Sequence, residues 1–260
     1  MFKKIRPFLL SAAILVFVSS AFMLINHFYN VYRNNKSYDE IKEVYNIEDS
    51  FRFQDSNTQL TQEEIEAELN KMREERFKVL QELNDEVVAW IYIPGTKINY
   101  PVVRADNNDY YLNHNAEKKS NKAGAIFMDY HNKVDKKNGI NDKNIVIYGH
   151  NMKDGSMFSG LRNYKDKEFY TNNKYIYMDT EAGRKRFEIF SVFVTKTDFN
   201  YIKTDFKESK EYAEFLKSVE NKSLYKTEAV PSPEDQIITL STCTYEYDDA
   251  RLVVAGKLIK

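Results

Sequence analysis

The stretch QIITLSTC at residues 236–243, followed by RLVVAGKLI at residues 251–259, carries the most information about the fold. Both segments are rich in β-branched residues, and a polar loop separates them, which predicts an antiparallel pair of strands. Successive side chains of a strand point to opposite faces. This alternation directs Ile238 and Leu240 toward the core and brings Cys243 out at the strand end, on the more polar face.

Six further short segments upstream have the same strand-like character and are bounded by turn residues. They are residues 87–93, 100–104, 123–128, 144–149, 174–179 and 186–196. Eight strands with few long helices predict a closed or nearly closed barrel. The 19 Tyr and 17 Phe against 8 Gly also favour strands over coil. We therefore expect an all-β fold with added helices, one of them at residues 208–219, inserted between late strands.

The N-terminus carries basic residues and then an apolar run at residues 8–25. This run is close to the roughly 20 residues that span a bilayer and longer than the roughly 7–15 of a signal-peptide core. We expect a cytoplasmic basic tail at residues 1–7, a membrane anchor at 8–29, and everything after it outside the cytoplasm. A cleaved signal peptide is the alternative, because small residues surround Ser20.

The anchor is followed by a polar region at residues 30–60 with no sustained apolar period, which we interpret as a tether or a loosely packed helical stalk. Thr61 and Glu64 then form the pattern of a capping box. Apolar residues recur at helical spacing after it, which predicts a helix at 61–83. Residues 61–260, which include this helix and all the predicted strands, are expected to form one folded domain.

The charge and motif content argue against several classes of function. The formal net charge is −1, which provides no field that would attract nucleic acid, so no nucleic-acid partner is expected. The sequence has no Gly-rich phosphate loop and no cluster of Cys and His at the spacing of metal ligands. We therefore expect neither a cofactor nor a metal.

Cys243 is the only cysteine, so in an exported protein it cannot form an internal disulfide. It is either an inert buried residue, an intermolecular link or a reactive group. Arg251 follows eight residues later and opens the next strand. If the residues between them form a hairpin loop, the Arg251 guanidinium lies near enough to contact an oxygen bound at the sulfur.

A thiolate nucleophile needs a base or a cation beside it, and histidine is the first candidate. Of the four histidines, His150 comes directly after the apolar run 144–149, where alternation places it on the same face as Tyr148. A strand presents a catalytic group to a cleft in this way. His131 is the reserve candidate, and the other two histidines lie at the end of the anchor and in a polar loop.

The TLSTC motif that ends at Cys243, with Arg251-Leu252-Val253-Val254 downstream, resembles the TLxTC signature and the following arginine of sortases. Further segments resemble class B sortases in particular, and the resemblance covers about residues 61–260. These segments are 90–96, 100–103, 106–112, 144–151 and the helix-bearing insertion after Lys196.

The resemblance implies an eight-stranded sortase-type β-barrel with an N-terminal helical segment. It implies a transpeptidase that cuts a sorting signal similar to NP(Q/K)T(N/G) after its Thr, holds the product as a thioacyl-enzyme and passes it to a peptidoglycan amine. Cys243 would be the nucleophile, His150 the proton-transfer partner and Arg251 the oxyanion stabiliser. The substrate contacts that it implies are Asn108, Leu112, Tyr148, Thr197, Tyr201, Ile202 and Ser241.

Three other interpretations compete with a transpeptidase. In papain-like hydrolases the cysteine precedes the histidine and starts a helix, whereas here Cys243 follows His150 and ends a strand. The second alternative is a cysteine protease that only hydrolyses. The third is a non-enzymatic, membrane-tethered surface-binding module in which Cys243 is inert.

Overall fold

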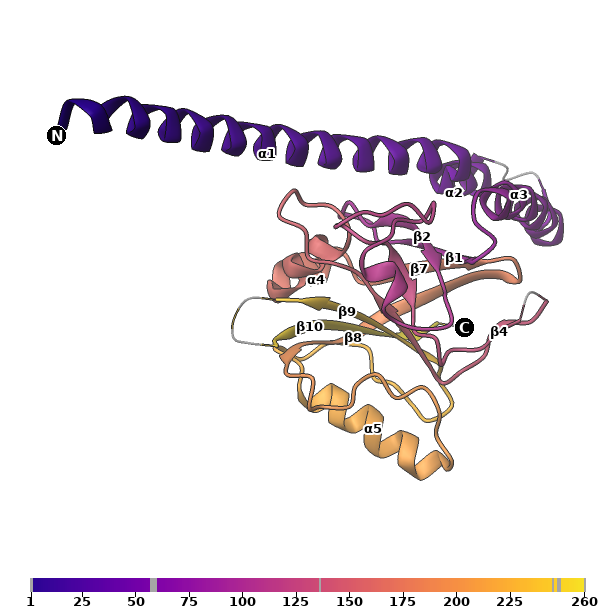
Figure 1. The fold of residues 1–260 in the computed structure, drawn as a ribbon. Helices are drawn as coiled ribbons and strands as arrows, with labels where there is room; N and C mark the ends of the chain where they lie inside the picture. Colours follow the sequence, from indigo (N-terminus) through magenta and orange to yellow (C-terminus); the bar gives the residue numbers. More distant parts are fainter. Residues whose placement is uncertain (1, 57–59, 136, 245, 247–248, 260) are drawn as a thin grey trace. The chain divides into compact units, whose positions relative to one another are not determined.

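The computed structural model describes residues 2–56, 60–135, 137–244, 246 and 249–259 (Figure 1). The chain divides into two compact units, residues 1–40 and Ile41–Lys260. Helix α1 (Phe2–Tyr45) makes up the first unit and ends within the second. The second unit contains the barrel and all the candidate catalytic residues.

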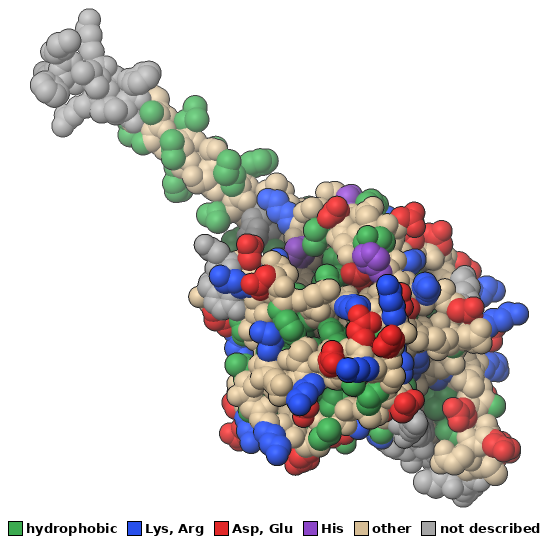
Figure 2. All heavy atoms as spheres, turned by 90° about the horizontal axis from the view of Figure 1, so that it is seen from below, with side chains coloured by type: hydrophobic (Ala, Val, Ile, Leu, Met, Phe, Trp, Pro, Cys, Tyr) green, Lys and Arg blue, Asp and Glu red, His purple; other side chains and the backbone are tan. Residues whose placement is uncertain are grey.

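The first unit exposes a band of large apolar side chains along α1, which include Leu15, Phe17 and Phe22 and are drawn green in Figure 2. Within the described residues, one helix is long and apolar enough to cross a membrane, and it is this one. Its length and composition agree with the anchor expected at residues 8–29. Signal sequences share both features, so both interpretations of this segment stay open.

Eight strands close into a barrel in the order β1-β2-β3-β6-β9-β10-β8-β7, which confirms the predicted architecture. The pairs β2–β3 and β6–β9 are parallel, and the other neighbouring pairs are antiparallel. Each of the eight lies at one of the segments predicted from the sequence. Their bounds are β1 Val87–Tyr92, β2 Asn99–Val103, β3 Ile126–Met128, β6 Asn144–Tyr148, β7 Tyr175–Thr180, β8 Gly183–Thr195, β9 Ile237–Cys243 and β10 Arg251–Leu258.

The connections between strands carry the remaining elements. The segment from β2 to β3 holds the 3-10 helix η1 (Tyr110–Leu112), and the segment from β6 to β7 holds η2 (Phe158–Lys165) and α4 (Lys167–Asn172). Between β8 and β9 lies α5 (Ser209–Asn221), the inserted helix predicted near 208–219. A small hairpin, β4 (Val134–Asp135) with β5 (Gly139–Ile140), was not predicted, because two-residue strands are too short to show alternation.

Strand β9 is buried on both faces from Ile237 to Thr242, and only Cys243 at its end is exposed. Its inner residues pack in the barrel, while α5 covers part of the outer face with an apolar cluster that includes Tyr212 and Leu216. The face that looked more polar in the sequence is therefore also buried. Its hydroxyls are paired inside the protein, since Thr239 Oγ1 donates to Asn144 Oδ1 over 2.7 Å.

The helix predicted at 61–83 is present as α3 (Gln62–Leu83), with Thr61 as its N-cap. The capping box forms in both directions: the Glu64 N–H donates to Thr61 Oγ1 over 3.2 Å, and the Thr61 N–H donates to Glu64 Oε2 over 2.8 Å. Ile65, Phe77 and Leu80 are buried, so one face of α3 packs within the second unit.

The tether expected at residues 30–60 is wrong for residues 41–56, which form the end of α1 and helix α2 (Ile47–Ser56) within the second unit. The Tyr45 ring stacks on Trp90 with centroids 4.2 Å apart, and its hydroxyl donates to Asp179 Oδ2 over 2.9 Å. Ile47 is buried as well. The segment is buried through a few apolar side chains that lie among many charged residues. Its high average polarity predicted exposure, although these few side chains are buried.

Candidate active site

The candidate nucleophile and the candidate oxyanion residue face each other across one strand pair. Cys243 is the last residue of β9, Arg251 is the first of β10, and their Cα atoms are directly paired in the antiparallel register. The Thr244 N–H donates to Ala250 O over 3.1 Å, so the ladder continues one step beyond them. Hydrogen-bonded strands thus fix the Cα positions from which the Cys243 and Arg251 side chains extend.

The backbone of Cys243 is held from a second element. Asn151, which is buried, donates from Nδ2 to the Cys243 carbonyl over 2.9 Å. Sequence reasoning did not assign Asn151 a role, although its place directly after His150 in the chain was visible. It links the chain beyond β6 to the end of β9.

His150 lies two residues beyond β6, which runs parallel to β9 in the register Tyr148 to Ser241. The Gly149 N–H donates to Ser241 O over 3.2 Å, so His150 follows the course of β9 toward Cys243. His150 Nε2 lies 2.8 Å from Leu112 O. Since a carbonyl oxygen only accepts, Nε2 carries a proton, and Nδ1 is the nitrogen that can still take or give one.

Gly124 closes the wall behind the His150 ring. It has φ +60°, and a Cβ placed there would lie 3.0 Å from His150 Cδ2 and 2.5 Å from Tyr111 O. A larger residue would therefore meet both the imidazole and a backbone carbonyl, in a conformation that side chains rarely adopt. The ring position depends on a glycine outside any strand.

The Arg251 guanidinium is half-buried and makes one hydrogen bond among the described residues, from Nη1 to Ala250 O over 3.1 Å. An arginine has five N–H donors, so most of them stay available to a ligand in the cleft. A planar guanidinium suits the two lone pairs of a carbonyl oxygen or an oxyanion.

A cleft of about 260 Å³ brings the three candidate catalytic residues together with much of the expected substrate set. Its walls come from the β2–β3 connection, β6, β9 and β10. It is lined by Asn108, Asp109, Leu112, Phe127, Tyr148, Gly149, His150, Ser241, Thr242, Cys243 and Arg251. A larger hollow of about 540 Å³ beside α5 contains none of the candidate residues.

Three of the seven expected substrate contacts do not line this cleft. Thr197 and Ile202 are exposed in the segment that leads to α5. Tyr201 is buried, and its hydroxyl lies 2.9 Å from Ser241 Oγ. Burial raises the pKa of Tyr201, so the phenol is neutral. Tyr201 does not line the cleft itself but is hydrogen-bonded to Ser241, which does.

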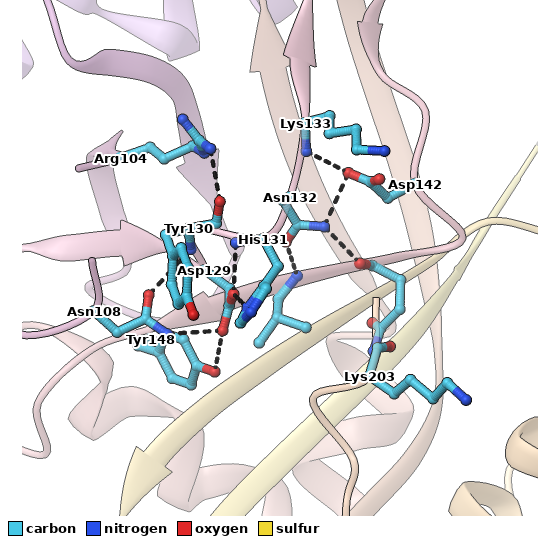
Figure 3. Close-up of polar contacts among 12 residues, drawn as sticks. Arg104, Asn108, Asp129, Tyr130, His131, Asn132, Lys133, Asp142, Tyr148 and Lys203 are labelled. Atoms are coloured by element: carbon cyan, nitrogen blue, oxygen red, sulfur yellow. Dashed lines mark hydrogen bonds and ion pairs between the residues drawn. The ribbon is translucent and has the colours of Figure 1, made fainter. Parts of the chain in front are cut away.

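A buried carboxylate that sequence reasoning did not single out contacts two residues that line the cleft, Asn108 and Tyr148 (Figure 3). Asp129 Oδ2 accepts from the Tyr148 hydroxyl over 2.7 Å and from Asn108 Nδ2 over 2.9 Å. Its Oδ1 accepts from the His131 N–H over 2.9 Å and from His131 Nδ1 over 2.8 Å. The reserve candidate His131 is exposed and does not line the cleft, so its position favours a contact with Asp129 over one with Cys243.

The described residues hold no group of three or more His, Cys, Asp or Glu side chains that could bind a metal. The side chains that line this cleft include a thiol, an imidazole and a guanidinium. Such a set can attack a carbonyl carbon, move a proton and stabilise a negative oxygen.

Comparisons with known proteins identify the family of this chain. Residues 91–259 match the Sortase domain family. Sortase B of Listeria monocytogenes is 38% identical over 262 residues, which cover 98% of this chain and 99% of that protein. A crystal structure of a mutant form of Clostridium perfringens sortase B has TM-score 0.75 and 33% identity, and covers 87% of this chain and 99% of its own. A Staphylococcus aureus sortase B-substrate complex has a TM-score of 0.74 and 30% identity. The match covers 89% of this chain and 99% of the chain in that complex.

Proposed function

This chain belongs to the sortase family of cysteine transpeptidases, and from that premise we propose that it joins surface proteins to the cell wall through a class B type of reaction. The proposed substrate is a sorting signal similar to NP(Q/K)T(N/G), cut after its Thr. The proposed acceptor is a peptidoglycan amine. Support comes from the Cys243–Arg251 register at the head of a cleft that also contains His150.

In the first half of the proposed reaction, the Cys243 thiol passes its proton to His150, and the resulting thiolate attacks the carbonyl carbon of the signal's Thr, whose oxygen becomes an oxyanion. Arg251, on the facing strand, stabilises that charge with the N–H groups that make no hydrogen bond to another described residue. The tetrahedral intermediate collapses as the C–N bond breaks. His150 donates a proton to the departing amine, which leaves a thioester between Thr and Cys243.

The second half reverses these roles. The nitrogen of the acceptor amine attacks the thioester carbon, and His150 takes up the proton that this nitrogen loses. The C–S bond then breaks, which restores the Cys243 thiolate and forms a new amide. Because Leu112 O already holds His150 Nε2, Nδ1 is the atom proposed to exchange the proton in both halves.

The location that we propose for this reaction is the outer face of the cell membrane. The apolar helix at residues 8–29 would anchor the chain, and the basic residues before it would stay in the cytoplasm. The cleft would then meet secreted substrates as they leave the membrane. A protease that only hydrolyses the signal is the alternative, and the acceptor decides between the two.

The test uses full-length protein in detergent with a panel of fluorescence-quenched peptides, one of which carries Asn-Pro-Gln-Thr-Asn. Reactions run with and without triglycine as an amine acceptor, and mass spectrometry identifies the products. We expect cleavage after Thr, an acyl adduct on Cys243 and transfer of the acyl group to triglycine. Cleavage that gives only the free acid at every acceptor concentration would support a hydrolase instead.

A further inference from the structure

The Asp129 carboxylate connects two walls of the cleft. Asn108 comes from the β2–β3 connection and Tyr148 from the end of β6, and both donate to the same oxygen, Asp129 Oδ2 (Figure 3). Asp129 itself is 1% exposed and does not line the cleft. It can therefore act on a ligand only through these two neighbours.

The carboxylate also determines which hydrogen-bonding groups of Asn108 and Tyr148 remain available to a ligand. An ionised carboxylate only accepts, so the single hydroxyl hydrogen of Tyr148 is directed at Asp129 and the phenolic oxygen can only accept from a ligand. Asn108 is oriented at both ends, because its Oδ1 accepts from the Tyr130 N–H over 3.1 Å while Nδ2 donates to Asp129. The second Nδ2 hydrogen of Asn108 remains for a ligand.

The surroundings keep Asp129 in the ionised form. Burial by itself would raise the pKa of this carboxyl, but hydrogen bonds from the His131 N–H, Tyr148, His131 Nδ1 and Asn108 outweigh it and hold the pKa below its ordinary value. Arg104 Nη2 donates to the Tyr130 carbonyl over 2.6 Å, which holds the turn that carries Asp129. The geometry is thus built around a charged acceptor with all four of its hydrogen bonds in place.

We propose that Asp129 is a positioning residue for the signal peptide, which holds Asn108 and Tyr148 so that the cleft offers one amide donor and one phenolic acceptor. An extended peptide carries alternating C=O and N–H groups, and such a pair can bind one of each. The inference rests on the proposed function. Asp129 would therefore contribute to substrate binding, while the bond-making atoms of Cys243, His150 and Arg251 stay as they are.

Asp129→Asn tests this, because an amide has one accepting oxygen where the carboxylate has two. The His131 backbone N–H is fixed, so the amide oxygen keeps that bond and its NH₂ faces Tyr148 and Asn108. The Tyr148 hydroxyl hydrogen must then point away from residue 129, because the new amide N–H donates to the phenolic oxygen. That oxygen no longer accepts from the peptide, and the hydroxyl instead presents a hydrogen in the wrong direction. We expect KM for the Asn-Pro-Gln-Thr-Asn peptide to rise about tenfold, as for one lost charged hydrogen bond, with kcat within about threefold of wild type.

Asp142→Asn is the matched control in the same region of the structure (Figure 3). Asp142 accepts from Asn132 Nδ2 over 3.1 Å and from the Lys133 N–H over 2.7 Å, and neither partner lines the cleft. Both contacts go to Oδ2, which the oxygen of an amide can replace, so the same change at this position should leave KM unchanged. A rise in KM as large as that of Asp129→Asn would show that the effect does not act through Asn108 and Tyr148.

A double-mutant cycle with Tyr148→Phe shows whether Asp129 acts through the phenol. We expect the KM of the double variant to be close to that of the more impaired single variant, because both remove the same acceptor. If Asp129→Asn does not fold, Asp129→Ser, which keeps one small oxygen acceptor, is measured against the same criteria.

The outcomes separate the inference from the proposed function. A wild-type enzyme that does not cleave any peptide of the panel contradicts the proposed function, and the inference falls with it. A wild type that cleaves the peptide, together with an Asp129→Asn variant whose KM stays within about twofold, overturns the inference alone, since the loss of a hydrogen bond to a charge should cost more. The inference is also overturned if the KM increase of the double variant equals the product of the increases of the two single variants, because the two residues then act independently.

Discussion

Cys243 and Arg251 are directly opposed residues of the antiparallel pair formed by β9 and β10. The hydrogen-bond ladder on both sides of β10 holds Arg251, because Thr195 of β8 pairs with it from the other side. The backbone of Arg251 is therefore held on the middle one of three paired strands. A fixed backbone position favours a role in oxyanion stabilisation, since such groups act through preorganised position.

Arg251→Lys should fail almost as badly as Arg251→Ala, because a compact ammonium on a flexible stem does not reproduce the planar fork. The loss of one oxyanion donor costs on the order of 10²–10³ in kcat. Steady-state cleavage of one good signal peptide, with thermal melts of all three proteins, measures it. A Lys variant within about threefold of wild type in kcat would assign Arg251 to ground-state binding, which affects KM.

Cys243→Ala should abolish cleavage and leave the fold intact. The side chain is exposed at a strand end, so its truncation opens no core volume. Surface substitutions of this kind usually stay within about 0.5 kcal/mol, which corresponds to about 2 °C in Tm for a domain of this size. Circular dichroism melts and peptide cleavage are the measurements. Cleavage retained by the alanine variant would contradict the assignment of the nucleophile.

Gly124→Ala should impair both stability and turnover. The added Cβ meets the Tyr111 carbonyl at 2.5 Å and the His150 ring at 3.0 Å, in a left-handed conformation. Backbone strain of this type costs about 1–3 kcal/mol, and the imidazole must move to relieve the contact. Gly183→Ala is the control, because that glycine also has positive φ but no atom within 4 Å of the added Cβ. If kcat were reduced equally in both variants, the effect would not act through His150.

A chain that starts at Asn30 should be soluble, folded and active, whereas one that starts at Thr61 should be much less stable. The shorter chain lacks Tyr45, whose ring stacks on Trp90, and loses the buried Ile47. Tyr45→Ala in the longer chain isolates the ring contribution, which is about 3–5 kcal/mol for a large buried aromatic. Tyr45→Phe, which loses only the hydroxyl bond to Asp179, should cost about 1 kcal/mol. Equal melting temperatures for the two chains would show that residues 30–60 contribute no stability.

Asp129 should make the thermal stability of the protein depend on pH within a narrow acidic range. Its folded pKa lies below the unfolded value of about 3.9, so its stabilising contribution is complete above that value and is lost as pH falls through the folded pKa. The charged and titratable neighbours that face it are Tyr148 and His131. The Tm difference between wild type and Asp129→Asn should therefore be constant from about pH 5 upward and shrink below about pH 4. A difference that does not change with pH would show that the charge of Asp129 contributes nothing.

The sequence by itself predicted the barrel strands and the candidate catalytic residues. Short segments rich in β-branched and aromatic residues, bounded by turn residues, predicted all eight barrel strands, because such residues pack well on a buried pleated surface. The eight-residue offset between Cys243 and Arg251 predicted their pairing, since a hairpin is a local structure. The TLSTC motif, as a resemblance, implied the family that the comparisons then showed.

Only the tertiary structure decided how residues 41–56 are buried and which residues hold the walls of the cleft. The polar average of residues 41–56 concealed Tyr45, whose stacking on Trp90 depends on a contact 45 positions away in the chain. Nothing local distinguishes Asp129 from other loop aspartates, because its partners Asn108 and Tyr148 lie 21 and 19 positions away on two other elements. Closing the barrel brings these segments together, and a buried carboxylate needs donors from all of them at once to remain charged.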